Sequence, residues 1–156
     1  MARALMLAVI GAGHAPEDVC AMAREVGREI ASRGAVLING GLGGVMRAAA
    51  EGARSAGGHT IGIIPSYDRA SANEFVEFAV ATGMGEARNA IIIASADAVI
   101  AMAGEGGTLA EIGFAKKFGL PIIALKSWPE IAGLERATTP REAVDLALKL
   151  AACSRG

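Results

Sequence analysis

The chain alternates between short apolar segments and longer amphipathic ones. The apolar segments are rich in valine and isoleucine and mostly end at glycine or proline, a pattern typical of buried parallel strands. They predict strands over Leu5–Ile10, Val36–Ile38, Thr60–Ile64, Ala98–Met102 and Pro121–Leu125. The intervening segments carry apolar residues at helical spacing, and they predict helices over Pro16–Ser32, Gly44–Ser55, Glu86–Ser95, Thr108–Phe118 and Thr139–Ala152.

This alternation predicts an α/β protein with a Rossmann-like open parallel sheet, helices on both faces and a three-layer α/β/α order. The 156 residues suit a single domain, residues 1–156. In such sheets, ligands bind beyond the carboxyl ends of the strands. The one irregular stretch is Ser66–Gly85, within which Glu74–Ala81 alternates well enough to be an added strand.

Composition and charge narrow the classes of partner. Lysine and arginine are scattered and the formal net charge is −1, so the chain offers no basic stripe for a nucleic acid. No apolar segment approaches the ~20 residues that cross a bilayer, which argues against a membrane partner. Cys20 and Cys153 have neither metal-ligand nor disulfide spacing, and His14 and His59 fall at opposite ends of the predicted sheet. We therefore expect a cytoplasmic protein without a metal site.

The first strand-to-helix turn contains Gly11 and Gly13. A dinucleotide-binding fingerprint would need a third glycine where Pro16 stands, and an acidic residue where the second strand ends in Asn39. NAD binding is therefore not expected. Two interpretations of Gly11 and Gly13 remain open, a tight turn beneath the sheet or contact with a ligand.

The second turn holds Gly40, Gly41, Gly43 and Gly44 within five positions, shortly before Met46. A strand-to-helix turn needs one or two glycines, whereas a loop without side chains lets backbone N–H groups approach an anion. No Gly-Lys-Ser/Thr sequence follows, so this is not a nucleoside-triphosphate P-loop. We favour anion or ligand binding over close packing alone.

The third turn contains Gly104, Gly106, Gly107 and Thr108, with Glu111 one helical turn further on. One interpretation is a capping box made by Thr108 and Glu111. In the other, the glycine amides and the Thr108 hydroxyl bind a phosphate while Glu111 faces the adjoining sugar.

Arg88 lies near the start of the preceding helix. If that helix start faces the same crevice, its guanidinium could pair with a phosphate or with Glu111.

Together these residues resemble the LOG family, the cytokinin-activating phosphoribohydrolases of plants and bacteria, within the broader SLOG group of Rossmann-like nucleotide-binding domains. The resemblance runs from Leu5 to Leu125. The family signature Gly-Gly-Gly-x-x-Gly-Leu-Met-Gly-x-x-Ala is matched over Asn39–Ala50, where Asn39 and Arg47 replace glycines.

A second family signature, Pro-Gly-Gly-x-Gly-Thr-x-x-Glu, is matched over Ala103–Glu111, where Ala103 replaces proline and Glu105 replaces glycine. The resemblance implies that Glu111 stabilises an oxocarbenium-like ribose or positions water, and that Arg88 orients the sugar phosphate. It also implies a homodimer or a dimer of dimers, with sites near the interface and no cofactor required for catalysis.

Two departures keep a second function in view. Asn89 replaces the lysine that follows the family's arginine, and Glu105 places a carboxylate in a loop expected to hold a phosphate. The short chain also resembles the molybdenum cofactor carrier proteins of the same superfamily, which bind a pterin phosphate without transforming it. Relatives are often labelled lysine decarboxylase-like, but nothing in the sequence indicates a pyridoxal phosphate site.

Two hypotheses therefore stand. The first is an enzyme that cleaves the N-glycosidic bond of a nucleoside 5′-monophosphate to free base and ribose 5-phosphate. The alternative is a non-catalytic binder or carrier of molybdopterin or a nucleotide, in which Glu111 is only a helix cap. Both predict a bound phosphate-bearing small molecule, and the sequence does not name its base or pterin.

Overall fold

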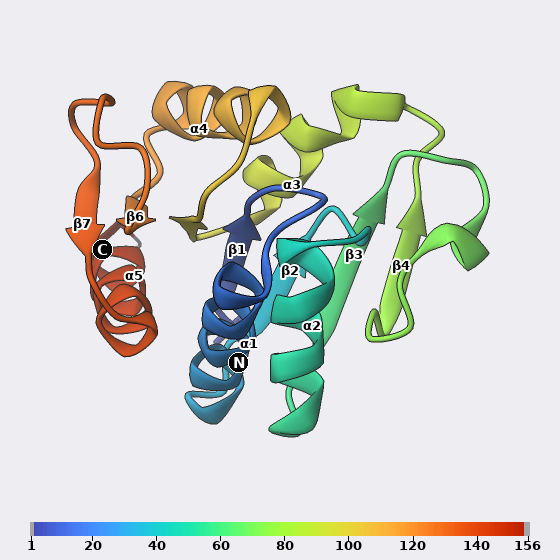
Figure 1. Ribbon diagram of the computed structural model, residues 1–156, viewed down its shortest axis with the longest axis horizontal. Coiled ribbons are helices and arrows are strands. Elements are labelled where there is room, and N and C mark those ends of the chain that lie inside the picture. The colour runs from blue at the N-terminus through green and yellow to red at the C-terminus, as the bar shows by residue number, and fades with distance from the viewer. Residues whose placement is uncertain (1, 155–156) are drawn as a thin grey trace.

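The computed structural model describes residues 2–154 and contains one parallel sheet with helices packed on its two faces (Figure 1). The strand order is β4-β3-β2-β1-β5-β6-β7. The strands are β1 (Met6–Ile10), β2 (Val36–Asn39), β3 (Thr60–Ile64), β4 (Phe78–Ala81), β5 (Ala98–Ala101), β6 (Ile122–Leu125) and β7 (Glu135–Ala137). All five predicted strands are confirmed to within one residue at each end.

The helices form the outer layers of the fold. They are α1 (Glu17–Ser32), α2 (Val45–Ser55), α3 (Asn89–Ser95), α4 (Gly106–Phe118) and α5 (Pro140–Ser154), with short 3₁₀ turns η1 (Arg69–Ser71) and η2 (Gly85–Arg88). One core cluster joins α1, α2 and α5 to the sheet, and a second joins α3 and α4 to its opposite face. The predicted three-layer α/β/α order is confirmed.

The two edge strands are the least regular part of the sheet. In the irregular segment, only Phe78–Ala81 of the proposed added strand pairs with β3, and β7 at the other edge was not predicted. The helix predicted over Glu86–Ser95 is divided into the 3₁₀ turn η2 and the α-helix α3. Within residues 2–154, no helix combines the length and the apolar character needed to cross a bilayer.

The strand order reverses at β1. From β1 the chain adds β2, β3 and β4 on one side, and it then returns to place β5, β6 and β7 on the other. The turns that follow β1 and its two neighbours, β2 and β5, therefore meet at one point beyond the carboxyl ends of the strands, where open α/β sheets bind ligands.

The loop after β6 is fastened to the end of β5. Trp128 Nε1 donates a hydrogen bond to the Met102 carbonyl oxygen at 2.9 Å, and Ser127 Oγ donates to the Ala101 carbonyl oxygen at 2.8 Å. Lys126 and Trp128 adopt positive φ angles of 48° and 53°, which non-glycine residues rarely do. These bonds hold the backbone directly before the third glycine-rich turn.

Candidate functional site

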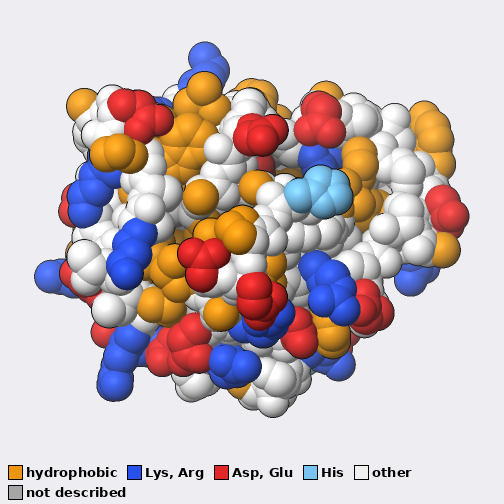
Figure 2. Space-filling view, viewed as in Figure 1, with side chains coloured by type: hydrophobic (Ala, Val, Ile, Leu, Met, Phe, Trp, Pro, Cys, Tyr) orange, Lys and Arg blue, Asp and Glu red, His pale blue; other side chains and the backbone are white. Residues whose placement is uncertain are grey.

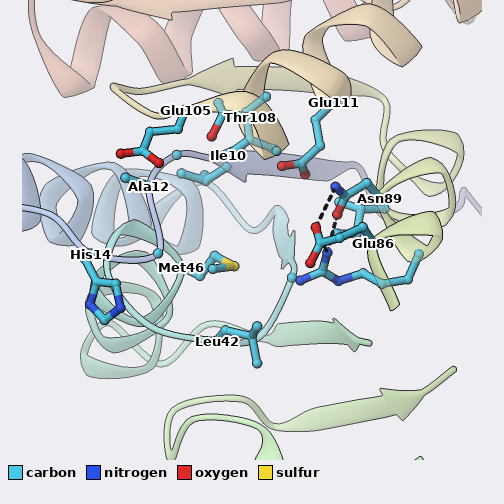
Figure 3. A pocket seen from close by; sticks show the side chains of 17 residues that line it. Ile10, Ala12, His14, Leu42, Met46, Glu86, Asn89, Glu105, Thr108 and Glu111 are labelled. Carbon is cyan, nitrogen blue, oxygen red and sulfur yellow. Dashed lines mark hydrogen bonds and ion pairs between the residues drawn. The ribbon is translucent and has the colours of Figure 1, made fainter. Parts of the chain in front are cut away.

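A cavity of about 290 Å³ opens where the three predicted turns meet (Figure 3). Eight of the residues predicted for the site line it: Gly11, Gly13, Gly40, Met46, Arg88, Gly107, Thr108 and Glu111. The other five, Gly41, Gly43, Gly44, Gly104 and Gly106, belong to the same turns but are not part of its lining. The structure therefore brings the three glycine-rich turns and Arg88 to one place.

Several of these glycines are required by packing. A Cβ atom on Gly44, whose φ is 59°, would lie 2.2 Å from the Ala12 carbonyl oxygen. A Cβ on Gly11 would lie 2.7 Å from the Val45 side chain. The first two turns thus pack closely against each other: Gly44 meets backbone and Gly11 meets a side chain. A larger residue has no room at either position.

Three other glycines have no such neighbours. The nearest atom to a Cβ on Gly13 is Met46 Cε at 4.0 Å, and the nearest to one on Gly107 is Glu86 Oε2 at 3.9 Å. A Cβ on Gly106 would meet no atom within 4 Å, and none of the three has a positive φ. Gly106 and Gly107 also begin α4, whose first N–H groups have no partner within the helix, so this is where an anion could approach the backbone.

Arg88 is buried and held from two sides. Its Nε donates to the Ile63 carbonyl oxygen at 2.8 Å, and its Nη1 donates to Asn89 Oδ1. Its Nη2 lies against Gly40, 2.8 Å from the position of a Cβ there, so any larger residue at 40 would displace the guanidinium. The start of the helical segment does face the crevice, which was the condition for a role of Arg88.

Glu111 is a buried acid in the same cavity, with 9% of its surface exposed. Burial raises its pKa to about 8, partly opposed by the nearby Arg88 charge and reinforced by Glu86. The carboxyl group is therefore mostly protonated at pH 7. Within residues 2–154 its side chain makes no hydrogen bond or ion pair, and Figure 3 shows it pointing into the cavity.

The capping-box interpretation of the third turn is wrong. Helix α4 begins at Gly106 with Glu105 as its N-cap residue, so Thr108 is already the third helical residue. The Thr108 side chain folds back over Gly104, where a Cβ would lie 2.1 Å from its hydroxyl oxygen. The Thr108 side chain therefore forms part of the cavity wall and does not cap the helix.

Sequence reasoning did not assign three further polar residues to this cavity. Glu86, Glu105 and His14 line it, and all three are exposed. Glu105 had been noted as a departure from a family signature, whereas Glu86 gave no signal except that it lies two residues before Arg88. Asn89, noted as a replaced lysine, is buried and donates from Nδ2 to Glu86 Oε2 at 3.4 Å.

Charged side chains of both signs are interspersed over the face seen in Figure 2, which shows no large patch of one sign. Within residues 2–154, no group of three histidine, cysteine, aspartate or glutamate side chains is placed to hold a metal ion. The chemistry available in the cavity is that of backbone amides, one guanidinium, one buried acid and two exposed carboxylates, together with the His14 imidazole, the Thr108 hydroxyl and the Asn89 amide.

Comparisons with known proteins identify the family of the chain. The family model described as the SLOG cluster4 family matches residues 4–150. A cytokinin riboside 5′-monophosphate phosphoribohydrolase of Mycobacterium tuberculosis is 34% identical over 127 residues, covering 75% of this chain and 67% of that protein.

Two solved structures resemble nearly the whole chain. The molybdenum cofactor binding protein of Rippkaea orientalis has a TM-score of 0.90 at 35% identity and covers 94% of this chain and 97% of its own. The molybdenum cofactor carrier protein of Chlamydomonas reinhardtii has a TM-score of 0.88 at 34% identity, with 96% and 99% covered. The resemblance drawn from the two glycine signatures is confirmed at the level of the family.

Proposed function

The chain belongs to the SLOG cluster4 family, and from this premise we propose that it binds a phosphate-bearing small molecule in the crevice and hydrolyses the N-glycosidic bond of a nucleoside 5′-monophosphate. The observation that carries the proposal is the pairing, in one cavity, of a buried Arg88 with a buried and mostly protonated Glu111. A general acid works best when its pKa lies near the working pH.

The reaction needs an acid to protonate the leaving base, an anion to stabilise the cationic sugar, and a water molecule; Glu111 serves as the acid and then, once ionised, as the anion. Glu111 donates its proton to the leaving nitrogen of the base as the C1′–N bond breaks. The carboxylate so formed stabilises the cationic sugar. It then takes a proton from the attacking water, whose oxygen bonds to C1′, which regenerates the acid and gives free base and ribose 5-phosphate.

The phosphate is placed by two groups in this proposal. The amide of Gly107, which lines the cavity at the start of α4, offers an unshielded donor, and the Arg88 guanidinium offers a fixed cation. Thr108 adds a hydroxyl from the wall of the cavity. No cofactor is required for these steps.

The test is release of free base from purified protein. AMP, GMP and a cytokinin-type ribotide are incubated with it, and the products are separated by chromatography. Glu111→Gln keeps the shape but removes the acid, so the rate should fall about 100-fold or more. In the wild type, the rate should also fall as the pH rises through the Glu111 pKa of about 8.

A matched control is Glu130→Gln, an exposed carboxyl outside the cavity, which should leave the rate unchanged. Base release that persists in Glu111→Gln would contradict the role of Glu111. If no base appears from any ribotide, the hydrolase proposal fails.

A second candidate is a carrier that holds molybdopterin or a nucleotide without cleaving it. The observation that favours it is Glu105 at the mouth of the cavity, together with Asn89 in place of the LOG lysine. The two solved structures that cover nearly the whole chain are named for binding or carrying the molybdenum cofactor. A ligand that copurifies with the protein, with no base released, would support this candidate over the enzyme.

The remaining expectations stay predictions. A homodimer or a dimer of dimers is testable by light scattering on the purified protein. A cytoplasmic location, and the absence of a nucleic-acid partner, are testable by cell fractionation and by titration with single- and double-stranded DNA.

A further inference from the structure

The cavity has two ends of different chemistry. Figure 3 shows Glu86, Asn89 and Glu111 at one end and Glu105 and His14 at the other, with Met46 between them. At the first end, Glu86 Oε2 lies 3.6 Å from Arg88 Nη1 and accepts a hydrogen bond from Asn89 Nδ2. At the second end, within residues 2–154, the Glu105 carboxylate makes no hydrogen bond or ion pair and does not cap α4.

Glu111 adds an acid that faces the cavity. It is about nine-tenths buried and points into the cavity, yet no group in the described part of the chain binds it. Among residues 2–154, no fully buried side-chain nitrogen or oxygen lacks a hydrogen-bond partner, so the Glu111 carboxyl oxygens reach the solvent in the cavity. A molecule bound there would meet these oxygens directly.

The charges of the cavity restrict what that molecule can be. The ionisable groups of its lining are one guanidinium, one imidazole, one buried acid and two exposed carboxylates: Arg88, His14, Glu111, Glu86 and Glu105. A phosphate adds further negative charge, so the free carboxylate of Glu105 opposes binding unless the ligand brings hydrogen-bond donors to it. The phosphate belongs at the Arg88 end, and the part that carries donors belongs at the Glu105 end.

We propose that Glu105 selects the ring of the ligand, by binding the two adjacent N–H donors of a 2-amino-4-oxopyrimidine edge. Guanine and pterin both carry this edge. Two carboxylate oxygens accept two parallel N–H bonds, whereas adenine offers one donor beside an acceptor and hypoxanthine lacks the amino group. The Met46 thioether, between the two ends, packs against the face of the ring.

This inference rests on the proposed phosphate-ligand site, and calorimetric titration at pH 7.5 tests the two separately. The probes are GMP, IMP, AMP and neopterin monophosphate, and each mixture is checked for released base. The wild type should bind GMP about tenfold or more tightly than IMP and AMP, because a charge-assisted hydrogen bond is lost with each. Glu105→Gln should abolish that preference, while Glu130→Gln should keep it.

Each outcome decides a different claim. Equal affinities for GMP and AMP would overturn the role of Glu105 and leave the phosphate site standing. A GMP preference that survives Glu105→Gln, with unchanged thermal stability, would also overturn it. Failure of all four phosphates to bind would overturn the proposed function and, with it, this inference. Tighter binding of neopterin monophosphate than of GMP would support the inference and identify pterin as the source of the edge.

Discussion

The glycine-rich turn before α2 and the one before α4 have similar compositions but different surroundings. In the first, Gly44 packs against the Ala12 carbonyl oxygen, and the Asn39 side chain bonds both the Gly41 amide and the Met46 carbonyl. In the second, Gly106 faces open space, and the nearest atom to a Cβ on Gly107 is Glu86 Oε2 at 3.9 Å, which is ordinary contact. A run of glycines therefore does not by itself locate a ligand, whereas the space around each glycine separates packing from binding.

The largest expected effect is on the packed turn. Gly44→Ala introduces a Cβ 2.2 Å from a carbonyl oxygen at a φ of 59°, so both strain and overlap oppose folding. The free energy of unfolding should fall by roughly 3–5 kcal/mol, measured by denaturant titration.

Gly57→Ala is the matched control for that change. Its φ is 76°, but no atom lies within 4 Å of a Cβ, so it should cost only about 1–2 kcal/mol. Equal losses for the two substitutions would show that backbone conformation, and not contact between the turns, explains Gly44.

The next effect is the pH dependence of stability that Glu111, in the helix after the open turn, should produce. Folding raises the Glu111 pKa from its ordinary 4.5 to about 8, so between these pH values the folded protein binds more protons than the unfolded chain. Stability should therefore be lost as the pH rises through this window, at up to about 1.4 kcal/mol per pH unit. Thermal melting between pH 5 and pH 8 should show the stability of Glu111→Gln rising steadily relative to that of the wild type, and a constant difference would contradict the raised pKa.

The smallest effect concerns the open turn. Gly107→Ala should leave stability unchanged or raise it by up to about 1 kcal/mol, since alanine favours helix and no clash arises. Affinity for GMP or AMP should fall about tenfold, because the methyl group covers the approach to the first amides of α4.

Gly113→Ala, on the same helix and also free of neighbours, is the control for this change. It should show the same stability without the loss of affinity. An unchanged affinity in Gly107→Ala would place the phosphate elsewhere in the cavity.

The central strands and the layer order were predictable because each strand is a continuous apolar run that must be buried. Strand β7 was not, since Glu135 and Arg136 make it polar and three residues carry no periodicity. The start of α4 was placed two residues late because Gly106 and Gly107 favour helix poorly. The first turn of α4 is therefore evident from the backbone conformation and not from the residue types.

The meeting of Arg88 and Glu111 followed from the rule that turns at the carboxyl ends of parallel strands converge. The division of glycines between packing and open space could not be predicted, because it depends on distances between turns far apart in the sequence. Glu86 escaped notice because an exposed glutamate on a 3₁₀ turn resembles any solvated charge.

The hydrogen bond from Trp128 to the Met102 carbonyl oxygen places an intrinsic fluorophore beside the candidate site. Trp128 is the single tryptophan of the chain, so its fluorescence reports one place, the end of β5 one residue before the turn that leads into α4. Any ordering of that turn by a ligand would alter the surroundings of the indole. Emission intensity and wavelength can therefore follow occupancy of the crevice in real time, without a dye and without knowing in advance which ring the ligand carries.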